Sequence, residues 1–237
     1  MSLAACGSVF ARYPTLDRPS SLVRETAQGL TAGLGSPREK ARAIFHFVRD
    51  EIQFGFTPYF DGATPNDTLA LRLGHCNPQS ALFASLLRAA GVPATQHFVD
   101  ISNEIIADLF PPYAAPPSRI THSYTEVELD GESLDVDGYI LDPTFHRSAL
   151  ALLSDEDRTI GYGAHAEGVV TWDGRVSSMS QLADPGMVLA DHGTFEDPAE
   201  FYDSDAYRQR LGAIGGFFYR AFALDPINAR IHAIRDA

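Results

Sequence analysis

The segment from Cys76 to Ala90 carries a strong helical signal. Its apolar residues recur at helical spacing, and the helix-ending residues Gly91 and Pro93 follow them. Cys76 therefore begins this helix, at a position where backbone N–H groups have no partner within the helix. A helix N-terminus favours the thiolate, which is the reactive form of cysteine, and its N–H groups can receive an oxyanion. Cys76 is thus a candidate nucleophile.

The segments on either side predict a further helix and several strands. Ser36 and Glu39 form a capping box with Pro37 at the first helical position, which predicts a helix over residues 36–52. Strand-like alternation occupies residues 94–101, 121–129 and 135–141. The last two strands are expected to pair antiparallel around the turn residues Asp130-Gly131.

Two irregular segments are candidates for the walls of a cleft. Residues 53–69 are rich in glycine, proline and aromatic side chains, and residues 103–119 contain four prolines. Loops of this length are usually functional, and binding residues are often carried on them.

A nucleophilic cysteine needs a base. His75 adjoins Cys76, but neighbouring residues at a helix start do not face each other. His122 begins a strand directly after the proline-rich segment, and is therefore expected at the opening of the cleft that this segment borders. His122 is therefore the preferred partner of Cys76.

The register of the predicted hairpin decides which carboxylate orients His122. A five-residue loop at residues 130–134, or a bulge at Asp137-Gly138, places Asp142 directly opposite His122 on one face of the sheet. The chemistry of a triad favours this longer loop or bulge, with Asp142 as the third member.

The strongest local turn signal points to a different register. If Asp130-Gly131 is a two-residue turn, Leu129 pairs with Glu132, and Asp142 falls on the face away from His122. In that register Asp137 shares the face of His122 and is the fallback, at a greater distance.

Three ordered motifs resemble those of a known family. They are Gly74-His75-Cys76 with the run RAAGVPA at residues 88–94, then His122 with its alternating strand, then Leu141-Asp142-Pro143-Thr144. Over residues 36–145 the chain resembles the transglutaminase-like superfamily.

The resemblance implies a papain-like α+β core in which the nucleophile-bearing helix packs on an antiparallel sheet. Cys76 would be the nucleophile of a catalytic triad, His122 the base and then the acid, and Asp142 the residue that fixes the His122 tautomer. Such cysteine enzymes act on amide bonds through a thioester, which water or an amine resolves. Protease-like hydrolysis is expected over transglutamination, since water is always available. For the second oxyanion donor, Gln53 and Asn66 are candidates.

Two alternatives remain open. The core could be a catalytically degenerate binding module, since a fold alone does not select a function. The pattern Arg72-x-Gly74-x-Cys76 also resembles the arylamine acetyltransferases, so acyl transfer from a thioester donor is the other alternative.

The resemblance divides the chain into three parts. Residues 1–35 are expected to form an N-terminal helical segment, residues 36–145 the catalytic core, and residues 146–237 a C-terminal extension of mixed strand and helix packed on the core.

The charge balance of the chain limits the classes of binding partner that are expected. With 18 Lys and Arg against 31 Asp and Glu, the net charge of −13 disfavours nucleic acids and anionic membranes. The expected substrate is a peptide, a protein or a small amide. No zinc-ligand spacing or nucleotide-binding loop occurs, so no cofactor or metal is expected. Two cysteines and the lack of a leader-like or membrane-spanning stretch predict a cytoplasmic protein.

The two cysteines should differ in reactivity. We expect Cys76→Ala to abolish labelling by an iodoacetamide probe, while Cys6→Ala leaves labelling intact, because only Cys76 is expected to have a base. Mass spectrometry of the labelled protein measures this. Equal labelling of both cysteines that is insensitive to His122→Ala would contradict the prediction.

Overall fold

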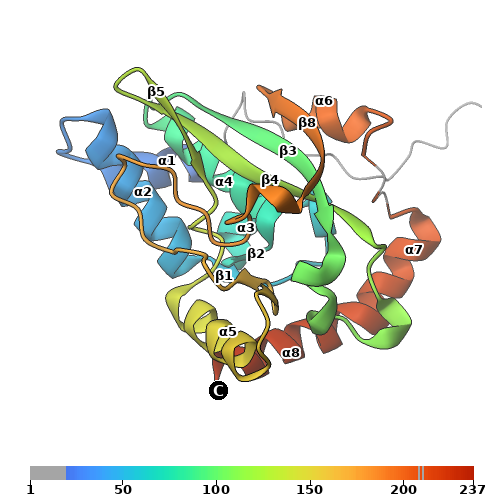
Figure 1. The fold of residues 1–237 in the computed structure, drawn as a ribbon. Helices are drawn as coiled ribbons and strands as arrows, with labels where there is room; N and C mark the ends of the chain where they lie inside the picture. Colours follow the sequence, from blue (N-terminus) through green and yellow to red (C-terminus); the bar gives the residue numbers. More distant parts are fainter. Residues whose placement is uncertain (1–19, 208, 210) are drawn as a thin grey trace, which may run out of the picture.

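A four-stranded antiparallel sheet forms the centre of the fold (Figure 1). The structure is a computed structural model that describes residues 20–237 except residues 208 and 210. The strands lie in the order β5 (Glu132–Val136), β4 (Arg119–Leu129), β3 (Ala94–Ser102) and β8 (Val188–Phe195). None of the described helices has the length and apolar character needed to cross a membrane.

Helix α4 (Cys76–Ala89) packs against strands β3 and β4. It is buried along almost its whole length, since α1 (Ser21–Thr31), α2 (Pro37–Glu51) and α3 (Pro65–Leu71) pack around it. The predicted α+β fold, with the helix that bears Cys76 on an antiparallel sheet, is confirmed.

Capping explains where two of these helices begin. The predicted box of Ser36 and Glu39 starts α2. A second box of Thr64 and Asp67 starts α3, again with proline at the first helical position. The prediction of a continuous loop over residues 53–69 is therefore wrong at its C-terminal end, although the capping signal was present in the sequence.

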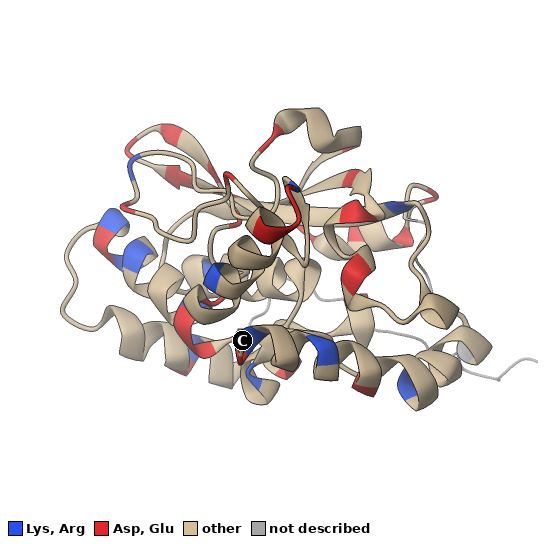
Figure 2. Cartoon of the chain, turned by 60° about the horizontal axis from the view of Figure 1, so that its bottom comes forward, with Lys and Arg blue, Asp and Glu red and all other residues tan. Residues whose placement is uncertain are grey.

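The rest of the chain wraps around this centre with short elements. The proline-rich segment folds into three 3-10 turns. The C-terminal part adds β8 to the edge of the sheet and packs its last helix, α8 (Leu224–Arg235), against α5 (Pro143–Asp155). Figure 2 shows acidic and basic residues interspersed along the ribbon. The remaining elements are β1 (Gln53–Phe54), η1 (Phe60–Gly62), β2 (Leu73–Gly74), η2 (Asn103–Ile105), η3 (Ala107–Leu109), η4 (Pro112–Ala114), α5 (Pro143–Asp155), β6 (Ile160–Gly161), β7 (Ala164–His165), η5 (Pro185–Met187), α6 (Pro198–Asp203), α7 (Ala213–Phe218), the π-helix η6 (Tyr219–Ala223) and α8 (Leu224–Arg235).

The β4–β5 hairpin has the short, two-residue turn. Asp130 and Gly131 both adopt positive φ, at 55° and 87°, as the turn that matches strand twist requires. Leu129 pairs with Glu132, and β5 ends at Val136. The prediction of a five-residue loop or a bulge, and of a strand over 135–141, is wrong because the local turn chemistry sets the register.

Asp142 consequently lies outside the sheet, at the start of α5. Its carboxylate caps the helix by accepting from the N–H of Phe145 at 3.0 Å. It also accepts from Nη2 of Arg235 at 2.8 Å, which joins α5 to the end of α8. Both side chains of this ion pair are largely buried.

We expect Asp142→Ala to lower the free energy of unfolding by about 2–4 kcal/mol, because it removes a cap and leaves Arg235 without its carboxylate. Urea unfolding measures the loss. Asp142→Asn is the matched control, since asparagine also caps helices, and its loss should be smaller. The folded variants should retain labelling of Cys76, and loss of labelling in a folded variant would contradict a structural role for Asp142.

Candidate active site

Cys76 is the first residue of α4, and its side chain is partly exposed. The N-cap residue, His75, makes no capping hydrogen bond with its side chain. The first backbone bond into the helix runs from the N–H of Gln79 to the carbonyl of His75, and Pro78 has no N–H. The N–H groups of Cys76 and Asn77 therefore lie at an uncapped, electropositive helix end.

His122 lies on β4 and is 1% exposed. Burial alone would lower the pKa of its imidazole, but the charge of Cys76 and the contact with Asp137 outweigh burial and raise this pKa to about 9. Both side chains line the same narrow cavity. The structure thus brings together Cys76 and His122, which the sequence singled out.

The carboxylate beside His122 belongs to Asp137. Nε2 of His122 lies 3.3 Å from Oδ2 of Asp137, and both side chains are almost fully buried. Nε2 makes no well-aligned hydrogen bond, so the contact is mainly electrostatic. Burial opposes the charge on Asp137, but His122 and nearby backbone N–H groups hold the pKa of this carboxyl below its usual range.

A loop from the C-terminal part of the chain supplies those N–H groups. The carboxylate of Asp137 accepts from the backbone N–H of Ser180, from the N–H of Gln181 at 3.3 Å and from the N–H of Leu182 at 3.0 Å. The hydroxyl of Ser180 adds a bond at 3.0 Å. These four hydrogen bonds compensate the ionised carboxylate of Asp137 for the loss of water on burial.

The chain turns sharply where Asp137 leaves the sheet. The N–H groups of Asp137 and Gly138 both donate to the carbonyl of Ser178, at 2.8 and 2.9 Å. A Cβ at Gly138 would lie 2.8 Å from the carbonyl oxygen of Val169, so the close approach requires glycine. Asp142, placed opposite His122 by the predicted register, is not its partner in the structure. The Asp-Gly pair directly after a strand was the available signal for Asp137.

A second buried histidine–carboxylate pair lies on the other side of Cys76. Nε2 of His75 is 2.8 Å from Oδ1 of Asp61, which also accepts from Nδ2 of Asn77 at 2.9 Å. The hydroxyl of Tyr207 donates to the other carboxylate oxygen at 2.6 Å. Phe56 stacks on the His75 ring with centroids 4.7 Å apart. This network, which sequence reasoning missed, holds both residues that flank Cys76.

Asn77 connects the helix to the sheet. Its Oδ1 accepts from the hydroxyl of Ser123 at 2.9 Å and lies 3.6 Å from the sulfur of Cys76. Nε2 of Gln96 donates both to this hydroxyl and to the carbonyl of Asn77. The spacing between Cys76 and the strand of His122 is therefore set by buried hydrogen bonds.

The cavity at Cys76 is narrow, with a volume of about 30 Å³, enough for about one water molecule. Neither predicted oxyanion donor lines it: Gln53 is exposed on β1, and exposed Asn66 accepts from the hydroxyl of Ser20. The amide side chains in its wall are Asn77, Gln181 and Gln209. Within the described residues, no three His, Cys, Asp or Glu side chains cluster as a metal ion would need.

Comparison with known proteins covers the same region. Residues 24–138 match the family model of the transglutaminase-like superfamily, a segment that includes Cys76, His122 and Asp137 and ends before Asp142. No curated protein sequence matches the chain significantly.

Two crystal structures are distantly similar. One is a candidate cysteine protease from Cytophaga hutchinsonii, with 14% identity and a TM-score of 0.45, covering 79% of this chain and 46% of that one. The other is a candidate protease from Parabacteroides distasonis ATCC 8503, with 16% identity and a TM-score of 0.38, covering 52% of this chain and 26% of that one. The chain thus spans less than half the length of either protein.

The matched family is the one that the motifs around Cys76 and His122 resemble, and the matched segment contains the helix and the strand that carry them. Residues 24–138 therefore belong to the transglutaminase-like superfamily.

Proposed function

We propose that this protein is a cysteine hydrolase that cleaves amide bonds through a thioester at Cys76. The observation that carries the proposal is the convergence of Cys76, at an uncapped helix N-terminus, with His122 and the buried carboxylate of Asp137. With Nε2 of His122 turned to Asp137, Nδ1 is the ring nitrogen left for the sulfur. Asp137 takes the positioning role that the sequence assigned to Asp142.

Acylation would begin from a thiolate–imidazolium pair. The thiolate of Cys76 attacks the amide carbonyl carbon, and the backbone N–H of Cys76, at the uncapped start of α4, would donate to the oxyanion. The C–N bond then breaks, and His122 gives its proton to the leaving amine. The product of this half-reaction is a thioester on Cys76 and a free amine.

Deacylation reverses the proton transfer. His122 takes a proton from water, the resulting hydroxide adds to the thioester carbonyl, and the C–S bond breaks to release a carboxylic acid and the thiolate. The same thioester would yield an amide if an amine replaced water. Mass spectrometry of products formed with and without added amine separates hydrolysis from acyl transfer.

Matched aspartate variants test the roles of the two carboxylates. In a screen of peptides and small amides, Cys76→Ala should abolish turnover, and Asp137→Asn should lower kcat/KM by about 10²–10⁴-fold because His122 loses its orienting charge. Asp142→Asn should lower kcat/KM by less than about tenfold.

Circular dichroism confirms that each variant is folded. Ser180→Ala, which removes one donor to Asp137, is the milder variant if Asp137→Asn does not fold, and it should lower kcat more than it raises KM. Full activity of folded Asp137→Asn would overturn the assignment.

The charge on Cys76 should be visible in the titration of His122. We expect Cys76→Ala to shift the pKa of His122 down from about 9, because the variant loses the sulfur's charge while the ring stays buried. Nuclear magnetic resonance of the histidine ring carbons measures this. His46 is the internal control, since burial and Arg49 lower its pKa independently of Cys76. An unchanged pKa of His122 would show that no such ion pair exists.

A further inference from the structure

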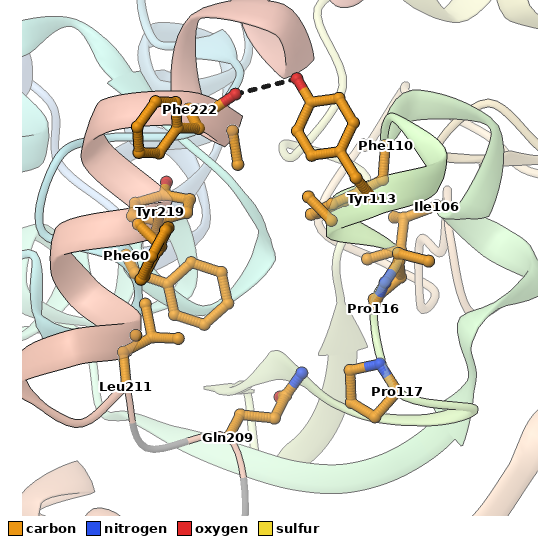
Figure 3. A pocket seen from close by; sticks show the side chains of 15 residues that line it. Phe60, Ile106, Phe110, Tyr113, Pro116, Pro117, Gln209, Leu211, Tyr219 and Phe222 are labelled. Carbon is orange, nitrogen blue, oxygen red and sulfur yellow. Dashed lines mark hydrogen bonds between the residues drawn. The ribbon is translucent and has the colours of Figure 1, made fainter.

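A second, much larger cavity adjoins the one at Cys76. Its volume is about 750 Å³, and its walls share Phe60, Ile106 and Gln209 with the narrow cavity that contains Cys76 and His122. Figure 3 shows its two opposing walls. Tyr219 and Phe222 stand on one side together with Phe60, and the proline-rich segment stands on the other. The segments predicted as cleft walls, 53–69 and 103–119, both contribute.

Both tyrosine hydroxyls and the side-chain oxygen of Gln209 in this cavity are already bonded within the chain. The hydroxyl of Tyr113 donates to the carbonyl of Phe222 at 3.0 Å, and the hydroxyl of Tyr219 donates to the carbonyl of Thr57 at 2.7 Å. Oε1 of Gln209 accepts from the N–H of Thr121 at 2.8 Å. None of the described lining residues carries a charge. The cavity therefore suits an uncharged, apolar ligand.

Large aromatic side chains of the same wall remain open to solvent. Phe218 is 57% and Phe222 is 53% exposed, and Tyr113 across from them is 71% exposed. Covering such side chains with an apolar ligand is favourable, at ~25 cal/mol per Å². A volume of about 750 Å³ lies in the range of small-ligand sites and exceeds what a single side chain fills.

We propose that the acyl group transferred through Cys76 carries an extended, uncharged apolar chain, and that this larger cavity binds the chain. The inference rests on the proposed function and names its substrate class. Its support is that the two cavities adjoin: Phe60 and Ile106 line both. A chain held between the aromatic wall and the proline-rich segment therefore lies next to the cavity that contains Cys76.

Alkylation of the full chain tests the cavity without requiring turnover. Iodoacetamide and N-octyl-iodoacetamide carry the same electrophilic carbon, and each forms a C–S bond at Cys76 and expels iodide. We expect the rate constant for the octyl reagent to exceed that for iodoacetamide at least about tenfold, because burial of about two methylene groups already supplies this factor. Ala115→Trp adds bulk to the cavity lining and should bring the ratio of the two rate constants close to one.

Ala151→Trp is the matched control, because Ala151 is exposed on α5 away from either cavity, and it should keep the native ratio. The inference would be overturned if the ratio of rate constants were near one in the unmodified protein, or if Ala115→Trp left this ratio unchanged. It would also be overturned if light scattering showed a dimer that Ala115→Trp dissociates, because a second copy of the chain would then occupy the cavity.

The two proposals fail separately. Hydrolysis that depends on Cys76, together with an octyl ratio near one, keeps the proposed function and removes the apolar substrate. A high octyl ratio without hydrolysis of any amide shows that the cavity binds apolar chains but that the protein is not the proposed hydrolase.

Discussion

The buried charge of Asp137 is the constraint on which the site depends. An ionised carboxylate at this depth is stable only if donors or an opposite charge surround it. Residues 180–182 provide the donors and His122 provides the charge. Because those donors lie in the C-terminal part of the chain, the orientation of His122 requires residues well beyond the matched domain of residues 24–138.

Cys76 is held by a comparable arrangement at the start of α4. Asp61 binds His75 and Asn77, the residues on either side of Cys76, and the hydroxyl of Tyr207 completes its coordination. Asn77 also joins the start of α4 to Ser123 on β4. Two buried carboxylates thus hold the surroundings of Cys76 and His122, and Phe60 lines both this centre and the apolar cavity.

Local signals in the sequence predicted the helices and strands at the centre of the fold. The periodicity and end signals of residues 76–90 located α4 within one residue, and the capping box at Ser36 located α2. The hairpin was mispredicted for an instructive reason. A triad that includes Asp142 would need a longer loop, whereas Asp130 and Gly131 supply the positive φ values of a two-residue turn, and this local turn determines the register.

The sequence by itself singled out Cys76 and His122 as candidates and located the helix and the strand that carry them, because helix starts, strand alternation and family motifs are local patterns. It did not identify the carboxylate that lies beside His122. Asp137 reaches His122 only because the chain leaves the sheet after Val136 and bonds to residues 178–182, some 40 positions further along. Asp142, favoured by its motif, caps a helix and pairs with Arg235 instead. Contacts between such distant segments form only in the folded protein, so the choice of carboxylate belongs to the tertiary structure.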